Sequence, residues 1–394
     1  MIETASLVDQ YCHGVLTTEL GLGTFETQLG GGALPAPGTT FFDTQTGVAI
    51  RRWCPPLLGL EPHCTPARYL ARRRELGTLE VSRRLLRATG ISTYLVDTEG
   101  AEGAEDTHDI HGTGGPAGPG SPGALTGAAE TAATGAAHGR EIVRLEPLAA
   151  RVAATAGGVG AFLAGLAEAV HTAAASAVAL SAAATTRPGH ALDPEPPGPG
   201  EVRGAAGRWL SGRGPGRGAG PGAGLGGDPG GGPLTDPVLL RHLHWTAVGT
   251  GLPLHLSARG GTDAYPFAAA TAGTGGALVL RDTYPYHRDA ACLTGLFPQV
   301  YADLGSVLTR TGAGAAGVLA EMLDSAPFGK LLFSTGARGL PELHLVGARV
   351  FRVALERVLG GWVRDGAWSV GDARRVAGLI AAGNARRVHG LTDD

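Results

Sequence analysis

The sequence predicts a distorted (β/α)8 TIM-like barrel that carries two Gly/Pro-rich insertions. Two observations lead to this fold class: short apolar runs rich in strand-forming residues recur along the chain, and helical stretches lie between them. Eight β-units separated by helices favour a parallel barrel over an open sheet. The expected strands are, in chain order, residues 5–11, 91–98, 141–147, 175–185, 252–258, 277–283, 300–309 and 330–336.

The stretches between these strands place apolar residues at helical spacing. Clear examples are SRRLLRAT and FLAGLAEAVHTA, which precede the second and the fourth strand. A periodicity of this kind predicts helices that pack one face against a core. The expected helices cover residues 82–89, 162–173, 238–251, 315–326, 343–363 and 372–388.

Two Gly/Pro-rich tracts interrupt the pattern, at residues 99–127 and 187–234. Neither tract has enough apolar residues to offset the entropy of ordering it. The second contains one short helix candidate, EVRGAAGRWLSG. Because loop closure costs grow only slowly with length, we interpret both tracts as flexible insertions between barrel elements. Residues 1–394 are then a single barrel domain.

Composition and charge exclude several classes of partner. The net charge is −3 and the pI is about 6.5, so no bulk attraction to nucleic acid or to anionic membranes is expected. The arginines of GRGPGRG have no interleaved aromatic residues. The first residues show neither a charged region nor a long apolar segment, and no run of 18 apolar residues occurs. We expect a soluble, cytoplasmic protein with no nucleic-acid and no membrane partner.

The four cysteines do not form a recognisable metal or disulfide pattern. They are Cys12, Cys54, Cys64 and Cys292, and no pair has the spacing C-x2-C. A structural zinc site is therefore not expected. Four cysteines in a chain of this size also do not indicate a disulfide framework.

The stretch VDQYCHG ends the first expected strand with several polar side chains. Barrel enzymes place their chemistry at the carboxyl ends of the strands. Tyr11 and His13 have the spacing of a His-x-His metal motif in which the first histidine is replaced by tyrosine. The stretch therefore indicates a site at this end of the barrel, and leaves its chemistry open.

Seven segments of the chain resemble the amidohydrolase superfamily, and within it the amidohydrolase-2 branch, which includes the N-terminal domain of nodulin/FluG-type proteins. FFDTQTGVAIRRW and YPYHR are the most specific of these signals. The resemblance implies a distorted (β/α)8 barrel in which one or two divalent metals deprotonate a water that attacks a carbon atom of the substrate. The segments are VDQYCHG, FFDTQTGVAIRRWCPPLLGLEP, LLRATGISTYLVDTEG, DPVLLRHLHWTAVGTGLPL, TYPYHRDAACLTGLFPQVYADLG, APFGKLLFSTGARGLPELH and NARRVHGL.

The sequence departs from the ligand set that this resemblance implies. Of the expected His-x-His pair only His13 remains, and Asp282 stands at an expected histidine. Catalytic zinc sites normally use three protein ligands, so we expect no metal cofactor. If zinc, iron or manganese were bound, His13 and Asp282 would be its ligands. The other expected ligand positions hold Tyr11, Ser181, Ser257 and Gly336.

Several other residues are candidates for binding a substrate. Arg52 and Trp53 can bind a carboxylate and stack on a planar group. The alternative is a purely structural role, in which the neighbouring Arg51 forms an ion pair with an acid such as Asp43. Asp97 ends the second strand, where it can face the mouth or cap the next helix. The resemblance also places His287, Arg288 and His344 at family-specific positions, where they line the pocket or hold a loop.

Two weaker signals come from the loops. His108 and His111, with Asp106 and Asp109, can supply replacement metal ligands, although a solvated polar loop explains them as well. Residues 312–317 read GAGAAG, which satisfies the dinucleotide pattern G-x-G-x-x-G after an expected strand. With 66 glycines in the chain this match is weak, and a phosphate site after strands seven and eight is a further possibility.

Three functional hypotheses follow. The first is a divergent enzyme that acts on a small polar or carboxylated metabolite, with His13 as general acid/base, Asp282 orienting it or activating water, and Tyr11 donating a hydrogen bond. Without a metal, lyase, isomerase or cyclising chemistry is easier than amide hydrolysis. The second is an inactive pseudoenzyme that binds a metabolite or a partner. The third is a metal-dependent hydrolase with ligands relocated to the His108/His111 loop.

The resemblance also bears on partners. Because FluG-type relatives can be fused to a glutamine synthetase domain, it implies a glutamine-synthetase-type partner. A homo-oligomer is the alternative expectation. We expect no glutamine synthetase domain in this chain.

Overall fold

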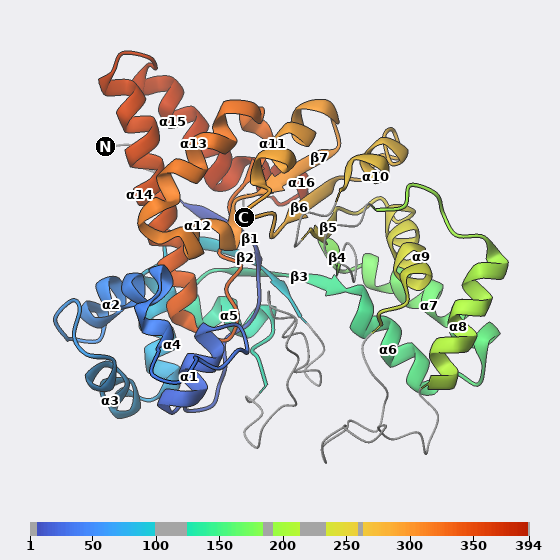
Figure 1. The fold of residues 1–394 in the computed structure, drawn as a ribbon, viewed down its shortest axis with the longest axis horizontal. Coiled ribbons are helices and arrows are strands. Elements are labelled where there is room, and N and C mark those ends of the chain that lie inside the picture. The colour runs from blue at the N-terminus through green and yellow to red at the C-terminus, as the bar shows by residue number, and fades with distance from the viewer. Residues whose placement is uncertain (1–5, 99–123, 184–191, 213–233, 259–262, 393–394) are drawn as a thin grey trace.

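The computed structural model contains eight parallel strands arranged as a barrel, as the sequence predicts (Figure 1). It describes residues 6–98, 124–183, 192–212, 234–258 and 263–392. Each strand pairs with the next one along the chain. The strands are β1 (Leu7–Cys12), β2 (Ile91–Asp97), β3 (His138–Arg144), β4 (Ala179–Ala183), β5 (Leu254–Ser257), β6 (Leu278–Arg281), β7 (Val300–Asp303) and β8 (Leu331–Leu332).

Individual backbone bonds close the ring between the first and last strands. The N–H of Gln10 donates to the carbonyl of Phe333 at 3.2 Å, and the N–H of Gly336 donates to that of Tyr11 at 3.1 Å. Further along, the N–H of His13 donates to the carbonyl of Ala337 at 2.8 Å. A register shift interrupts β1 between Asp9 and Cys12, which is the form of a β-bulge. The barrel is therefore distorted where β1 enters the mouth.

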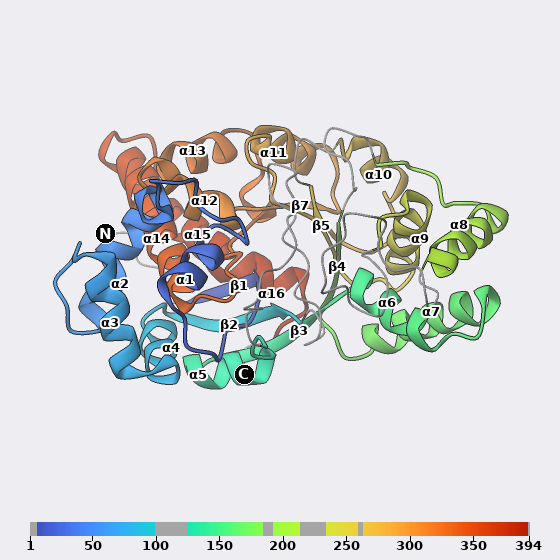
Figure 2. The ribbon, with the colours of Figure 1, turned by 60° about the horizontal axis from the view of Figure 1, so that its bottom comes forward.

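Helices surround the strands (Figures 1 and 2). All six expected helices are present, although the stretch 372–388 is divided by a π-helical turn, Leu379–Gly383. The α-helices are α1 (Leu22–Leu29), α2 (Gln45–Leu57), α3 (Pro66–Leu76), α4 (Thr78–Arg87), α5 (Ala128–Gly135), α6 (Leu145–Thr155), α7 (Val159–Ala174), α8 (Pro199–Gly212), α9 (Pro237–Val248), α10 (Tyr265–Ala270), α11 (His287–Leu296), α12 (Gly305–Thr311), α13 (Ala315–Ser325), α14 (Pro341–Arg364), α15 (Val370–Gly378) and α16 (Asn384–Val388).

One expected strand is wrong in its second half. Residues 300–309 were expected to form one strand, but β7 ends at Asp303 and the helix α12 begins at Gly305. The apolar residues of YADLGSVLT have a spacing that suits a strand as well as a helix. Short apolar runs of this kind do not distinguish the two structures. The early strand end places Asp303 at the mouth of the barrel.

The C-terminal helix covers the end of the barrel opposite the mouth. Val8, Val279 and Leu332 form a small apolar cluster with Ala382 and Ala385, which come from the π-helical turn and from α16. Just beyond it, the Nε2 atoms of His255 on β5 and His389 lie 2.9 Å apart. Burial lowers the pKa of His389 to about 4, so the pair is uncharged at neutral pH. This layer forms the floor beneath the site.

The two Gly/Pro-rich tracts are described only in part. Residues 99–123, 187–191 and 213–233 lie outside the described residues. The short helix expected inside the second tract is present as α8, which buries Val202, Ala205 and Ala206 and packs against α7 and α9. Within the described ranges, no helix is long and apolar enough to span a bilayer.

Candidate functional site

Polar side chains gather at the carboxyl ends of the strands and point into the barrel. Tyr11, Asp97 and Ser181 come from β1, β2 and β4, and all three are buried. Asp97 Oδ2 accepts hydrogen bonds from the Tyr11 hydroxyl at 2.7 Å and from the Ser181 hydroxyl at 2.6 Å. The other oxygen, Oδ1, is buried and has no hydrogen-bond partner among the described residues. These contacts unite three strands around one carboxylate.

His13 lies beside this carboxylate. Its Nε2 is 3.3 Å from the Tyr11 hydroxyl, and its Nδ1 is 3.3 Å from the backbone carbonyl of Asp97. Burial lowers the pKa of His13 to about 3, so the imidazole is neutral at physiological pH. Burial on its own would raise the pKa of Asp97, but His13, Arg144 and the two hydroxyl hydrogen bonds together hold it below its usual value. The cluster thus pairs a neutral imidazole with an ionised carboxylate.

Arg281, the last residue of β6, crosses the barrel interior. Its guanidinium carbon lies 3.4 Å from the centre of the Tyr11 ring, on a strand three places away around the barrel. The residue is 3% exposed. Its Nη1 is 3.7 Å from Asp282 Oδ2. A cation therefore lies inside the ring of strands, between the Tyr11–His13–Asp97 cluster and Asp282.

Asp282 is held in a fixed orientation next to Arg281. Its two oxygens accept hydrogen bonds from the hydroxyls of Ser257 and Ser306, each at 2.9 Å. Its φ angle of 56° turns the backbone immediately after β6. A positive φ is uncommon for residues other than glycine and is tolerated best by aspartate and asparagine.

Asp303 is a second buried acid, and its pKa is shifted upward, whereas that of Asp97 is shifted downward. It ends β7, and its carboxylate accepts hydrogen bonds from the Gln10 amide and the Ser334 hydroxyl, each at 2.9 Å. Burial raises its pKa to about 7, and these two hydrogen bonds and Arg281 offset only part of the rise. Two acids with pKa values moved apart are typical of sites that exchange protons near neutral pH.

The close approach of Gly305 to this acid gives a testable prediction. A Cβ at Gly305 would lie 2.2 Å from Asp303 Oδ2 and 2.4 Å from Ser334 Oγ. Gly305→Ala should therefore displace the carboxylate and lower the free energy of unfolding by about 1 to 3 kcal/mol, the usual cost of overpacking. Urea denaturation measures this change.

The matched control is Gly317→Ala. Gly317 lies in α13 with open space at the Cβ position, so the substitution should be neutral or stabilising by about 0.5–1 kcal/mol. Equal stability of the two variants would contradict the packing described for Gly305.

The positions that the resemblance assigns to metal ligands do not fit a divalent ion. Among them, only His13 and Asp282 carry a usual metal-binding group. The hydroxyls of Tyr11 and Ser181 donate to Asp97, and that of Ser257 donates to Asp282. At the last position, a Cβ on Gly336 would lie 3.0 Å from the Cβ of Ser306, so an aspartate side chain there would be crowded against Ser306.

A group with metal-type side chains lies elsewhere among the described residues. Asp9, Cys12 and His344 are fully buried between β1 and α14 and place their ligand atoms within 4.8 Å of one another. Asp9 already accepts hydrogen bonds from the Thr335 N–H at 2.8 Å and hydroxyl at 2.6 Å. This group faces α14 and does not belong to the mouth.

The remaining predicted residues are placed away from the Tyr11 cluster. Arg52 stacks over Trp53 on α2, which packs against α14 and α12 outside the strands. Arg51 forms the expected ion pair with Asp43, at 3.6 Å. Their role in substrate binding stays a prediction.

The YPYHR residues hold a loop in place. His287 Nε2 and Arg288 Nη2 each lie 2.7 Å from a carboxylate oxygen of Glu321 on α13. This contact fixes the loop after β6 to a neighbouring helix, which is one of the two roles expected for these residues.

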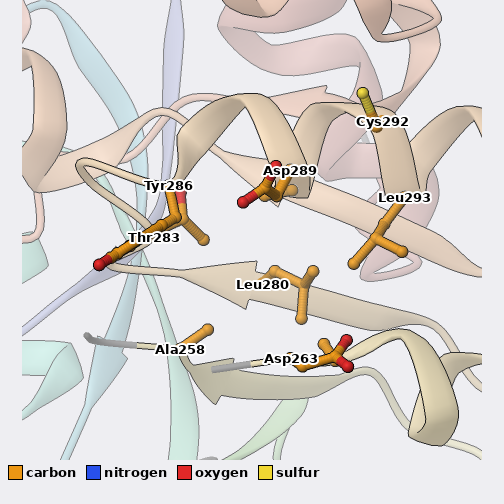
Figure 3. A pocket seen from close by; sticks show the side chains of 10 residues that line it. Ala258, Asp263, Leu280, Thr283, Tyr286, Asp289, Cys292 and Leu293 are labelled. Carbon is orange, nitrogen blue, oxygen red and sulfur yellow. The ribbon is translucent and has the colours of Figure 1, made fainter. Parts of the chain in front are cut away.

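A pocket of about 320 Å³ opens between β5, β6, α10 and α11 (Figure 3). Thr283 and Tyr286 line one end of it, and Cys292 and Leu293 line the other. Its lining does not include the Tyr11–His13–Asp97 cluster, so this pocket and the polar cluster are different places.

The loop signals have different outcomes. Residues 106–111, which carry the histidines proposed as replacement ligands, lie outside the described residues. The dinucleotide interpretation of GAGAAG is wrong in its context, because Gly312–Gly314 forms a 3-10 turn that follows the helix α12 and not a strand.

Sequence reasoning missed Arg281 and Asp303. Both are charged residues that end an apolar run, LVLR and VYAD respectively. The signal that could have identified them is a charged residue at the last position of a buried strand. For Asp303 this signal was hidden, because the seventh strand was expected to continue to residue 309.

Comparisons with known proteins agree with this fold. No family model matches the chain. The FluG protein of Emericella nidulans is 34% identical over 117 residues, which are 29% of this chain and only 14% of that protein. A protein assigned as a metal-dependent hydrolase from Lactobacillus casei superposes with a TM-score of 0.75 at 18% identity, covering 99% of this chain and 96% of the other.

Sugar-acid isomerases share the fold more distantly. Glucuronate isomerase from Caulobacter crescentus superposes with a TM-score of 0.58 at 12% identity over 99% of this chain and 92% of the other. Uronate isomerase from Thermotoga maritima gives 0.55 at 13% identity, over 98% and 94%. By its barrel and by the segment shared with FluG, the chain resembles the amidohydrolase-2 branch of the amidohydrolase superfamily.

Proposed function

We propose that this chain binds a small polar or carboxylated metabolite at the mouth of the barrel and acts on it by acid–base chemistry without a metal-activated water. The observation that carries the proposal is that the hydroxyls at the expected ligand positions donate hydrogen bonds to neighbouring carboxylates. Tyr11 and Ser181 donate to Asp97, while Ser257 donates to Asp282. A hydroxyl engaged in this way is a poor metal ligand, whereas the ordered polar cluster suits a polar substrate.

Proton transfer is the chemistry that these residues support best. An acid with a pKa near the working pH is the most effective general acid–base catalyst, and Asp303 meets this condition. The neutral imidazole of His13 and the Tyr11 hydroxyl can accept or donate hydrogen bonds to substrate oxygens. Isomerisation or elimination needs such groups and no strong nucleophile. The isomerases among the structural neighbours are named for carboxylated sugars, which fits a substrate of this class.

The alternative is a pseudoenzyme that binds a metabolite or a partner without turnover. Gly336 favours it, because neither metal nor proton can be held at that position. His13→Ala separates the two. An enzyme should lose about 10²- to 10⁴-fold in kcat, the usual contribution of a general acid or base. A pseudoenzyme should keep its ligand affinity nearly unchanged. Activity and binding assays against carboxylated metabolites measure both, with the exposed His171→Ala on α7 as the control.

Metal analysis of the purified protein tests the absence of a metal-activated water. The expected result is less than stoichiometric zinc, iron and manganese, and an activity that survives treatment with a chelator. A stoichiometric metal bound beside His13 by three or more side chains would contradict the proposal and would favour relocated ligands, such as His108 and His111.

A further inference from the structure

The guanidinium of Arg281 forms no hydrogen bond within the described part of the chain, although the residue is only 3% exposed. Its contacts are the face of the Tyr11 ring at 3.4 Å and the ion pair with Asp282 at 3.7 Å, which is longer than a hydrogen bond. Its Nε is buried and has no partner among the residues that the structure describes. A guanidinium carries five N–H donors, and buried donors normally find acceptors. Arg281 therefore lacks acceptors that its environment requires.

Arg73 shows how this chain treats an equally buried arginine that has a structural role. Its side chain is 6% exposed, and its Nε donates to Glu342 Oε1 at 2.6 Å, while its Nη2 donates to Oε2 at 3.5 Å. Both oxygens of the fully buried Glu342 carboxylate accept hydrogen bonds from Arg73. No carboxylate is placed in this way for Arg281 within the described ranges, so the two buried arginines serve different purposes.

The acids around Arg281 already accept hydrogen bonds from other side chains. Asp282 accepts from Ser257 and Ser306, each at 2.9 Å. Asp303 accepts from Gln10 and Ser334. Each of these carboxylates is oriented by neutral donors instead of by the guanidinium. The N–H donors of the Arg281 guanidinium are therefore available to an acceptor on a bound ligand.

We propose that Arg281 is the anion-binding residue of the barrel mouth: its guanidinium binds the carboxylate of a small substrate and supplies the fixed positive charge that the family resemblance would assign to a metal. This inference rests on the proposed function and names its substrate class. The residue is central enough for this role, because its charge acts on Tyr11 and His13 at the end of β1, on His255 in β5 and on Asp303 at the end of β7.

A carboxylate fits the site better than a phosphate. The planar guanidinium and a planar carboxylate form two parallel hydrogen bonds. A carboxylate adds one negative charge, whereas a phosphate monoester adds nearly two at neutral pH. Asp282 lies 3.7 Å from Arg281, and Asp97 accepts a hydrogen bond from Tyr11, whose ring Arg281 contacts. A dianion would be repelled by these carboxylates more strongly.

The test compares wild type with Arg281→Lys and Arg281→Met. The probes are acetate, D-glucuronate and inorganic phosphate, with glucose as the uncharged match for glucuronate. Binding is measured by calorimetry at low ionic strength. At least one of the two carboxylates should bind wild type more tightly than phosphate, and glucuronate should bind more tightly than glucose. Arg281→Lys should raise the Kd of the carboxylate at least tenfold, because lysine keeps the positive charge but cannot form two parallel hydrogen bonds to a carboxylate. Arg375→Gln, on the exposed face of α15, should leave it unchanged.

Thermal melting of Arg281→Met adds a readout that a structural role would move in the opposite direction. Removing Arg281 breaks no hydrogen bond among the described residues, and Asp282 keeps those from Ser257 and Ser306, so this variant should melt no lower than wild type. A lower melting temperature together with an unchanged carboxylate Kd in Arg281→Lys would overturn the proposal.

The remaining outcomes separate this inference from the proposed function. Carboxylate binding that both variants retain would overturn the role of Arg281 and leave the proposed function standing. Tighter binding of phosphate would overturn the substrate class. If neither carboxylate bound wild type, both proposals would fail.

Discussion

Glu342→Ala is expected to lower the free energy of unfolding by about 3 to 5 kcal/mol, the usual cost of leaving a buried charge without its partner. Glu342 is fully buried at the start of α14. It accepts hydrogen bonds from Arg73 at 2.6 Å and from the Tyr69 hydroxyl at 2.7 Å, both on α3. The substitution leaves an unpaired cation and an unsatisfied hydroxyl at one helix interface. Guanidinium chloride denaturation of wild type and variant measures the loss.

Two further variants show whether the loss comes from the orphaned charge. The double variant Arg73→Met/Glu342→Leu removes both charges, so it should lose much less than the sum of the single substitutions. Arg74 pairs with Glu19 at 2.9 Å, but both side chains are about 60% exposed. Arg74→Met should therefore change stability by less than about 1 kcal/mol. A loss below 1 kcal/mol in Glu342→Ala would show that α3 is not held by this pair.

Asp303→Asn is expected to make the protein more stable than wild type at alkaline pH. Burial raises the folded-state pKa of Asp303 to about 7, from 3.8 in a solvated chain. The folded protein therefore keeps a proton that the unfolded chain releases, and its stability falls as the pH rises from about 4 to 7. The total is on the order of 4 kcal/mol, because each pKa unit corresponds to about 1.4 kcal/mol.

Asparagine imitates the protonated acid and cannot ionise. Its oxygen can accept from Gln10, and its amide can donate to Ser334. Denaturation at pH 5 and pH 8 should show that the advantage of the variant grows by about 3 kcal/mol between these values. Asp289→Asn, an exposed acid on α11, serves as the control and should show no such dependence. If the advantage of Asp303→Asn did not change with pH, Asp303 would be ionised throughout.

Most of the barrel could be predicted from local pattern, because most strands are short apolar runs bounded by helices. The run at 300–309 was misread because its spacing suits either a strand or a helix. The helix α2 was not expected at all, since it contains Gly47, Pro55 and Pro56, which are poor helix formers. It is stabilised by packing against α14 and α12, which no local pattern reveals.

The candidate site could be predicted only in outline. Strand ends identified Tyr11, His13, Asp97 and Asp282 as residues of the mouth, and the structure brings the first three into contact. Arg281 reaches the Tyr11 ring beside two backbone features, the register shift in β1 and the positive φ of Asp282. Neither has a sequence signal strong enough to recognise beforehand.

The closure of the barrel between β1 and the residues after β8 has a consequence for folding during synthesis. Thr335 binds Asp9, its partner 326 positions earlier, and β1 completes its hydrogen bonds only with residues that follow β8. During synthesis, at about 5–20 residues per second, β1 has left the ribosome long before that segment exists. The open edge of the first strand is exposed to other nascent chains throughout this interval. Chaperone binding to the unfinished polypeptide would protect that edge until translation delivers the last strand.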